Sequence, residues 1–192
     1  TPTSLLTSPL CHVSGLSAGV VTSLFAGSTT LVYEGRFLPE KVLELITKYN
    51  VTSWGGAVPT ALKRVLDAAE TKNLYLPSVL VVGGGGAPMP PKLIERTKDV
   101  FPNSKYSFGY GYGLTESGAI TIINWGENLI NEPSSPGQTM PTIQVELRDE
   151  QGNVITQDAS EGEIYVRSPS VMLGYYNNPD ASNESLTNER WL

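Results

Sequence analysis

The chain has 192 residues, and its 13 Lys and Arg against 19 Asp and Glu give a formal net charge of −6. This length is enough for one large domain, or for one domain with a small second one, and it can bury a core without a disulfide. The acidic balance is opposite in sign to the basic surface that binds a phosphate backbone, so we expect no nucleic acid partner.

The single cysteine and the single histidine, Cys11 and His12, exclude an intramolecular disulfide and a zinc site with several Cys and His ligands. The most apolar stretch, residues 16–26, is interrupted by hydroxyl side chains and is shorter than the ~20 apolar residues of a membrane span. A signal peptide carries a positive charge ahead of its apolar region, whereas the first basic residue here is Arg36. We therefore expect a cytoplasmic chain with no transmembrane segment.

The first part of the chain repeats one pattern, an apolar run followed by a proline and then by apolar residues at helical spacing. The three apolar runs are residues 29–33, 51–54 and 79–82, and the helical patterns follow Pro39, Pro59 and Pro90. Proline is tolerated in the first helical turn, because the N–H that it lacks would be unpaired there anyway. We expect one more helix over residues 15–26 and one more strand over residues 105–108.

Strand and helix therefore alternate, which is the signature of an α/β fold. We predict a mostly parallel sheet with flanking helices over residues 1–132. The pattern then changes to short alternating runs at residues 144–148, 154–156 and 163–167, separated by turn-forming residues. This change predicts a small antiparallel, β-barrel-like subdomain over residues 133–192.

A glycine run, residues 83–86, directly follows the most apolar expected strand and precedes Ala87 and Pro88. In open α/β sheets ligands bind beyond the carboxyl ends of the strands, where glycine lets the main chain approach them closely. The alternative is a plain flexible connection. The run is not a dinucleotide-binding fingerprint, because Pro88 stands where the last glycine or alanine of that motif would pack.

The second candidate segment, residues 108–117, alternates glycines with aromatic side chains and ends in Thr115, Glu116 and Ser117. A tyrosine between glycines can lie against a purine, a threonine hydroxyl can donate to phosphate, and a carboxylate suits Mg²⁺. Each residue also has a structural alternative: Tyr112 in the core, Thr115 as a helix N-cap and Glu116 in a first helical turn.

His12 and Trp54 are weaker candidates. Neighbouring side chains of an extended chain point to opposite sides, so Cys11 and His12 are not expected to form a catalytic pair. A satisfied or pocket-lining histidine is the favoured interpretation. Trp54 is the last residue of an expected strand and lines either a pocket or the core.

Residues 111–116, Gly-Tyr-Gly-Leu-Thr-Glu, resemble the core motif of the AMP-forming, acyl-activating enzymes. This family contains acyl-CoA and aryl-CoA synthetases, luciferases and the adenylation domains of nonribosomal peptide synthetases. Residues 9–15, 51–60 and 85–88 resemble three further family segments in the expected order, and residues 162–181 resemble the stretch that ends Gly-Tyr-x-x-x-Pro-Glu-Ala-Thr.

The resemblance implies an enzyme that converts a fatty or aromatic carboxylic acid to an acyl-adenylate with ATP and Mg²⁺, then transfers it to coenzyme A. It implies catalytic roles for Thr115 and Glu116, with Glu116 as the metal ligand, and a substrate pocket at His12, Trp54 and Gly84. The nucleotide-binding residues that it implies are Gly85, Gly86, Ala87, Pro88, Tyr110, Gly111, Tyr112, Gly113, Leu114 and Thr115.

The family's phosphate loop, ribose-binding aspartate and catalytic lysine are not found in the sequence. The chain is therefore expected to be the central segment of such a ligase and inactive alone. Two alternatives are a stand-alone nucleotide-binding or interaction module and a peptide-synthetase adenylation domain. The second is less favoured, because Leu114 stands where those domains usually have proline.

Overall fold

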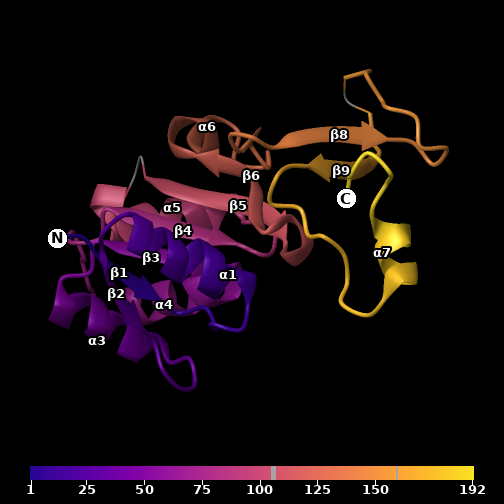
Figure 1. The fold of residues 1–192 in the computed structure, drawn as a ribbon. Coiled ribbons are helices and arrows are strands. Elements are labelled where there is room, and N and C mark those ends of the chain that lie inside the picture. Colours follow the sequence, from indigo (N-terminus) through magenta and orange to yellow (C-terminus); the bar gives the residue numbers. More distant parts are fainter. Residues whose placement is uncertain (105–106, 159) are drawn as a thin grey trace.

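A computed structural model describes residues 1–104, 107–158 and 160–192 and confirms the predicted α/β class (Figure 1). A seven-stranded sheet has the order β2-β1-β3-β4-β5-β6-β7, and a separate antiparallel pair is formed by β8 and β9. Strands β1 to β5 are parallel, and β6 and β7 add antiparallel pairings. The strands are β1 Thr3–Leu6, β2 Thr29–Val32, β3 Ser53–Ala57, β4 Val81–Gly85, β5 Phe108–Leu114, β6 Ala119–Trp125, β7 Gln138–Thr139, β8 Gln144–Arg148 and β9 Glu163–Arg167.

The three helices that the prolines predict are present, each with a proline in its first turn. The expected helix over residues 15–26 is also present, as a continuous run of three segments with a π-helical middle. The helical segments are α1 Val13–Gly15, η1 Leu16–Val21, α2 Thr22–Phe25, α3 Pro39–Tyr49, α4 Pro59–Thr71, α5 Pro91–Val100, η2 Pro102–Ser104, η3 Thr115–Ser117, α6 Gly126–Asn131 and α7 Pro179–Ser185. Among the described residues, no helix is long and apolar enough to cross a membrane.

The strand order places two connections in opposite directions along the sheet. From β1 the chain moves outward to β2, and from β2 it crosses back to β3 on the other side of β1. Right-handed crossovers then put the helical run α1–η1–α2 on one face of the sheet and α3 on the other. Helices α4 and α5 follow α3 on its face, because β3, β4 and β5 proceed in one direction. The crevice between the ends of β1 and β3 is thus a topological switch point.

The two glycine-rich segments lie in strands, which corrects the expectation that they are loops beyond strand ends. Residues 83–85 belong to β4, and residues 109–114 continue β5 up to Leu114. The first two residues of the strand expected over 105–108 lie outside the described residues. The strand extends further than expected because β6 pairs with β5 over its whole length, a contact that local propensity does not encode.

The C-terminal part contains less sheet than expected. Residues 154–156 form only an isolated bridge between Val154 and Arg148, so among the described residues the antiparallel unit is the two-stranded β8–β9 pair rather than a barrel. Strand β7 pairs with β6, so the large sheet continues past residue 132. The domain boundary near residue 132 stays a prediction.

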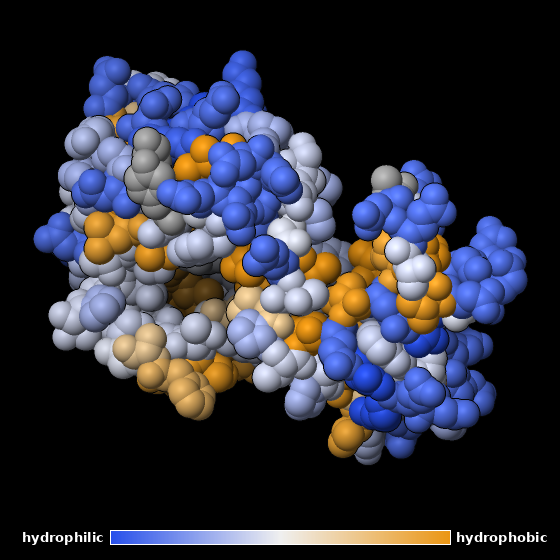
Figure 2. All heavy atoms as spheres, turned by 90° about the horizontal axis from the view of Figure 1, so that it is seen from above, coloured by the Kyte–Doolittle hydropathy of each residue, from blue (hydrophilic) through white to orange (hydrophobic). Residues whose placement is uncertain are grey.

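The core lies between the large sheet and helices α3, α4 and α5. It includes Val42 and Ile46 of α3, Leu62 of α4 and Ile94 of α5, all at most 3% exposed. In Figure 2 the C-terminal part is mostly hydrophilic, and apolar residues gather at its junction with the larger part and around a hollow in the larger part.

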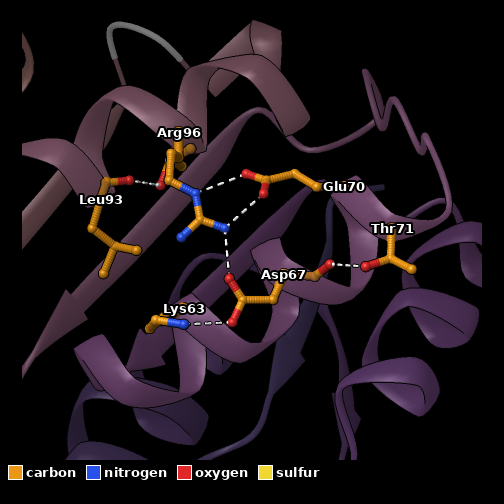
Figure 3. Close-up of polar contacts among 7 residues, drawn as sticks. Lys63, Asp67, Glu70, Thr71, Leu93 and Arg96 are labelled. Atoms are coloured by element: carbon orange, nitrogen blue, oxygen red, sulfur yellow. Dashed lines mark hydrogen bonds and ion pairs between the residues drawn. The ribbon is translucent and has the colours of Figure 1, made fainter.

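An ion-pair network joins α4 to α5 on the surface (Figure 3). The Arg96 guanidinium contacts both Glu70 oxygens at 2.8 Å and Asp67 Oδ1 at 2.7 Å, and Lys63 Nζ contacts Asp67 Oδ2 at 2.6 Å. Hydrogen bonds from Lys63 and then Arg96 hold the pKa of the Asp67 carboxyl below its usual value. The network ties two helices through one planar, bidentate side chain.

Arg96→Met should lower the free energy of unfolding by about 1 kcal/mol, the upper end for partly exposed ion pairs, as measured by urea denaturation. Because the pKa of Asp67 is lower in the folded than in the unfolded chain, its contribution is present above the unfolded value and is lost as pH falls through the folded one. The difference between Arg96→Met and the wild type should therefore shrink on acidification and in high salt. Lys92→Met, at an exposed position of the same helix, is the control, and an equal loss there would contradict the prediction.

Candidate functional site

The two glycine-rich motifs are neighbouring strands in register. Gly83, Gly84 and Gly85 of β4 pair with residues 109–111 of β5. At Gly85 a Cβ atom would lie 2.7 Å from the carbonyl oxygen of Gly111, so only glycine permits this approach of the two strands. Gly86 then turns the chain with φ of +78°, and it leads into the exposed residues Ala87 and Pro88. The paired glycine-rich residues of β4 and β5 thus form one continuous surface, which we call the ledge.

The turn after β5 presents Thr115 and Glu116 beside this ledge. Residues 115–117 form the 3₁₀ turn η3, and Gly118 ends it with φ of +86°. Ser117 is buried and its hydroxyl donates to the carbonyl of Leu114 at 2.9 Å, which closes the turn. Thr115 is exposed and Glu116 half-buried. The turn therefore offers a hydroxyl and a carboxylate next to each other.

Tyr110 and Tyr112 differ in their surroundings, although both lie on β5. Tyr110 is buried, its hydroxyl donates to the carbonyl of Ser135 at 2.6 Å, and burial raises the pKa of its phenol. Tyr112 is 41% exposed. Tyr112 therefore has a ring surface available to a ligand, whereas Tyr110 supports the strand from inside.

A pocket of about 970 Å³ lies at the ends of β1, β2 and β3, at the topological switch point. Most of its lining surface is apolar, and half of the lining residues carry polar or charged side chains, among them Glu34 and Arg64. All five parallel strands end at one edge of the sheet, so this pocket and the ledge of β4 and β5 share that edge. Residues from the three connections line it: Thr7, Ser8, Pro9, Leu10, His12, Ser14, Val32, Tyr33, Glu34, Gly35, Phe37, Gly56, Val58, Thr60, Ala61 and Arg64.

His12 lines this pocket and Trp54 does not. The backbone N–H of Ser14 donates to His12 Nδ1 at 3.1 Å, so the imidazole caps the helix that begins at Val13. Trp54 is fully buried in the core against Phe101, and its Nε1 donates to Thr7 Oγ1 at 3.1 Å. Of the two interpretations of Trp54, the structure supports the core one. Gly84 lies in β4 and is also not among the residues that line the pocket.

Glu116 is the carboxylate beside the ledge of β4 and β5, and Glu34 is a second one, at the pocket. The described residues contain no group of three or more Cys, His, Asp or Glu side chains that could hold an ion by themselves. A single carboxylate fits Mg²⁺ nonetheless, because that ion usually takes one or two carboxylates together with phosphates and water. Among the described residues, Oε1 of Glu116 accepts a hydrogen bond and no partner of Oε2 is found.

Sequence analysis missed that partner of Glu116, the hydroxyl of Tyr175, which donates to Oε1 at 2.8 Å. The two residues are 59 positions apart. Gly174 and Tyr175 lie in residues 162–181, which resemble a family segment. That resemblance was the one signal in the sequence that could have pointed to Tyr175. Sequence analysis also missed most of the pocket, since the residues after β2 carry no motif.

Comparisons with known proteins bear on the family and the fold of the chain. A family model described as "AMP-binding enzyme" matches residues 1–176. A 4-coumarate–CoA ligase-like protein of Arabidopsis thaliana is 30% identical over 184 residues, which cover 96% of this chain and 32% of the relative. The chain spans about a third of the length of the curated relatives that it matches.

Solved structures share the fold. The N-terminal domain of FACL13 from Mycobacterium tuberculosis, bound to an inhibitor, has a TM-score of 0.86 and 28% identity, covering 100% of this chain and 46% of its own. The o-succinylbenzoate CoA synthetase of Bacillus subtilis, in complex with ATP and a magnesium ion, has a TM-score of 0.83 and 30% identity, covering 100% of this chain and 38% of its own. With a family model matching residues 1–176 of 192, the chain belongs to the AMP-binding enzymes and is homologous to acid–CoA ligases.

Proposed function

We propose that the chain is the central part of an ATP-dependent acid–CoA ligase, which activates a carboxylic acid as an acyl-adenylate and transfers the acyl group to coenzyme A. The observation that carries the proposal is the shared edge of the sheet. There the glycine ledge of β4 and β5, the Thr115–Glu116 turn and the pocket at the switch point follow one another along five parallel strands.

Each part of this edge has a role in the proposal. Tyr112 and the segment 85–88 hold the adenine, because an exposed aromatic ring and an open main chain accept a flat base. Thr115 donates its hydroxyl to the α-phosphate. Glu116 ligates Mg²⁺, which supplies charge neutralisation to the phosphates.

The pocket at the switch point holds the acid. Its volume of about 970 Å³ and its apolar lining suit a fatty or an aromatic acid. Curated relatives are named for 4-coumarate, and a structural relative is named for o-succinylbenzoate, and both names favour an aromatic acid. His12 lies at the pocket wall, where it is held by the helix that it caps.

Glu116→Gln in the complete enzyme should lower the adenylation rate by ~100-fold or more, the scale of losing one preorganised electrostatic contact. The amide keeps the shape of the side chain but loses the charge that neutralises the metal. Pyrophosphate exchange measures the rate. An unchanged rate would leave Glu116 with only its structural place in the turn.

Ala61→Leu should shift acid preference towards smaller acids, because Ala61 of α4 lines the pocket. Pocket changes discriminate by ~1 to 3 kcal/mol per methylene, so the ratio of kcat/KM values for a large and a small acid should change by about tenfold or more. The KM for ATP should stay the same. Ala68→Leu, on the same helix and outside this pocket, is the matched control, and an equal shift there would contradict the assignment.

The isolated 192-residue chain should bind AMP better than ATP and should release no pyrophosphate with a mixture of fatty and aromatic acids. Its adenine ledge is present, but residues 84–88 and 110–116 contain no Lys or Arg, and the net charge of −6 repels a triphosphate. Calorimetry with AMP and with ATP measures the first part. Turnover by the isolated chain would contradict the second.

A further inference from the structure

The segment of residues 168–175 is fastened to the Thr115–Glu116–Ser117 turn by three hydrogen bonds. The backbone N–H of Met172 donates to the carbonyl of Glu116 at 2.7 Å, and the hydroxyl of Ser170 donates to the carbonyl of Ser117 at 2.7 Å. The third bond reaches the side chain, since the Tyr175 hydroxyl donates to Glu116 Oε1 at 2.8 Å. Of the three hydrogen bonds, only this one reaches the carboxylate of Glu116, the proposed metal ligand.

Tyr175 is itself held from behind by helix α7. Its backbone N–H donates to Ser182 Oγ at 2.8 Å, and the Ser182 hydroxyl donates to the carbonyl of Asn178 at 2.8 Å. Asn178 caps α7 by accepting from the N–H of Ala181. At Gly174 a Cβ would lie 2.9 Å from Ser182 Oγ, so glycine lets the chain pass this close to the helix.

The carbonyls just before Tyr175 are also engaged. The Arg190 guanidinium donates to the carbonyl of Met172 at 2.7 Å and to that of Leu173 at 3.3 Å. The main chain is therefore hydrogen-bonded both at Tyr175 and just before it. These bonds position the Tyr175 hydroxyl next to Glu116.

The chemistry of the contact matters as much as its geometry. A phenol is a neutral donor, so it orients the carboxylate without cancelling its charge, as a Lys or Arg partner would. Among the described residues, no ion pair to Glu116 is found. With Oε1 engaged, the rotation of the carboxylate is restricted before any metal arrives, and Oε2 is the oxygen left for it.

We propose that Tyr175 is a positioning residue that holds Glu116 in the orientation needed to ligate the magnesium ion of bound ATP. This inference rests on the proposed function, which gives Glu116 its metal.

The test is Tyr175→Phe in the complete enzyme, which removes the hydroxyl and keeps the ring. At fixed ATP, the Mg²⁺ concentration for half-maximal pyrophosphate exchange should rise by about tenfold, the scale of one hydrogen bond to a charged group. Saturating Mg²⁺ should restore most of the rate. Tyr176→Phe is the matched control, because that neighbouring side chain is 93% exposed, and its Mg²⁺ dependence should stay that of the wild type.

A second readout does not need activity. Calorimetry should show that Tyr175→Phe binds ATP normally in EDTA but gains about tenfold less affinity from Mg²⁺ than the wild type does. In the Glu116→Gln background, Tyr175→Phe should have no further effect on either measurement, since the tyrosine acts through that carboxylate.

The outcomes separate the two proposals. If Glu116→Gln is defective while Tyr175→Phe keeps the wild-type Mg²⁺ dependence, the positioning role is overturned and the proposed function stands. If Tyr175→Phe loses the same fraction of the rate at all Mg²⁺ concentrations and melts at a lower temperature, the hydrogen bond contributes to stability alone. That result also overturns the positioning role. If Glu116→Gln itself changes nothing, Glu116 is not the metal ligand and the positioning role of Tyr175 falls with it. The proposed function fails only if the complete wild-type enzyme exchanges no pyrophosphate with any carboxylic acid.

Discussion

The close pairing of β4 with β5 is the constraint on which the rest of the candidate site depends. A side chain at Gly85 would strike the carbonyl oxygen of Gly111, so the strands can approach this closely only because β4 carries a glycine there. The pairing with β4 places residues 108–111 of β5, and the pairing with β6 continues the strand to Leu114, directly before Thr115 and Glu116. The pairing of β4 with β5 also sets the ledge next to the pocket that the connections after β1, β2 and β3 enclose.

The helices that support the sheet and the turns that carry the candidate site residues are stabilised by different contacts. Arg96 ties α4 to α5 through residues that do not line the pocket, whereas the first turns of α4 supply pocket residues such as Ala61. The site residues sit on short turns at the strand ends, each closed by its own hydrogen bond: His12 caps its helix and Ser117 closes the turn that carries Glu116. In such a fold, changes in the turns can alter which ligand is bound while the sheet and its helices stay the same.

Sequence analysis predicted the parts of the fold that local signals encode. Pro39, Pro59 and the proline pair 90–91 mark helix starts, and the spacing of Val42 and Ile46 marks a buried helical face. Strand β1 has four residues and only two buried side chains, which is too short for a periodic signal. The glycine segments look like loops because their strand conformation is imposed by neighbours. For the candidate site, the motifs predicted Tyr112 and Glu116 as site residues, whereas the contact of Tyr175 spans 59 residues and has no local pattern.

The bonds from Ser170 and Met172 to the turn have a consequence for energetics. They join the segment that follows β9 to the end of β5, so the small antiparallel pair and the large sheet meet at the candidate metal ligand. By thermodynamic linkage, a ligand that favours one arrangement of this turn must favour the docked state of the following segment by the same free energy. Docking of that segment then raises the affinity for the ligand in return. A nucleotide bound at this turn, as proposed above, would in this way be coupled to the placement of residues 168–175.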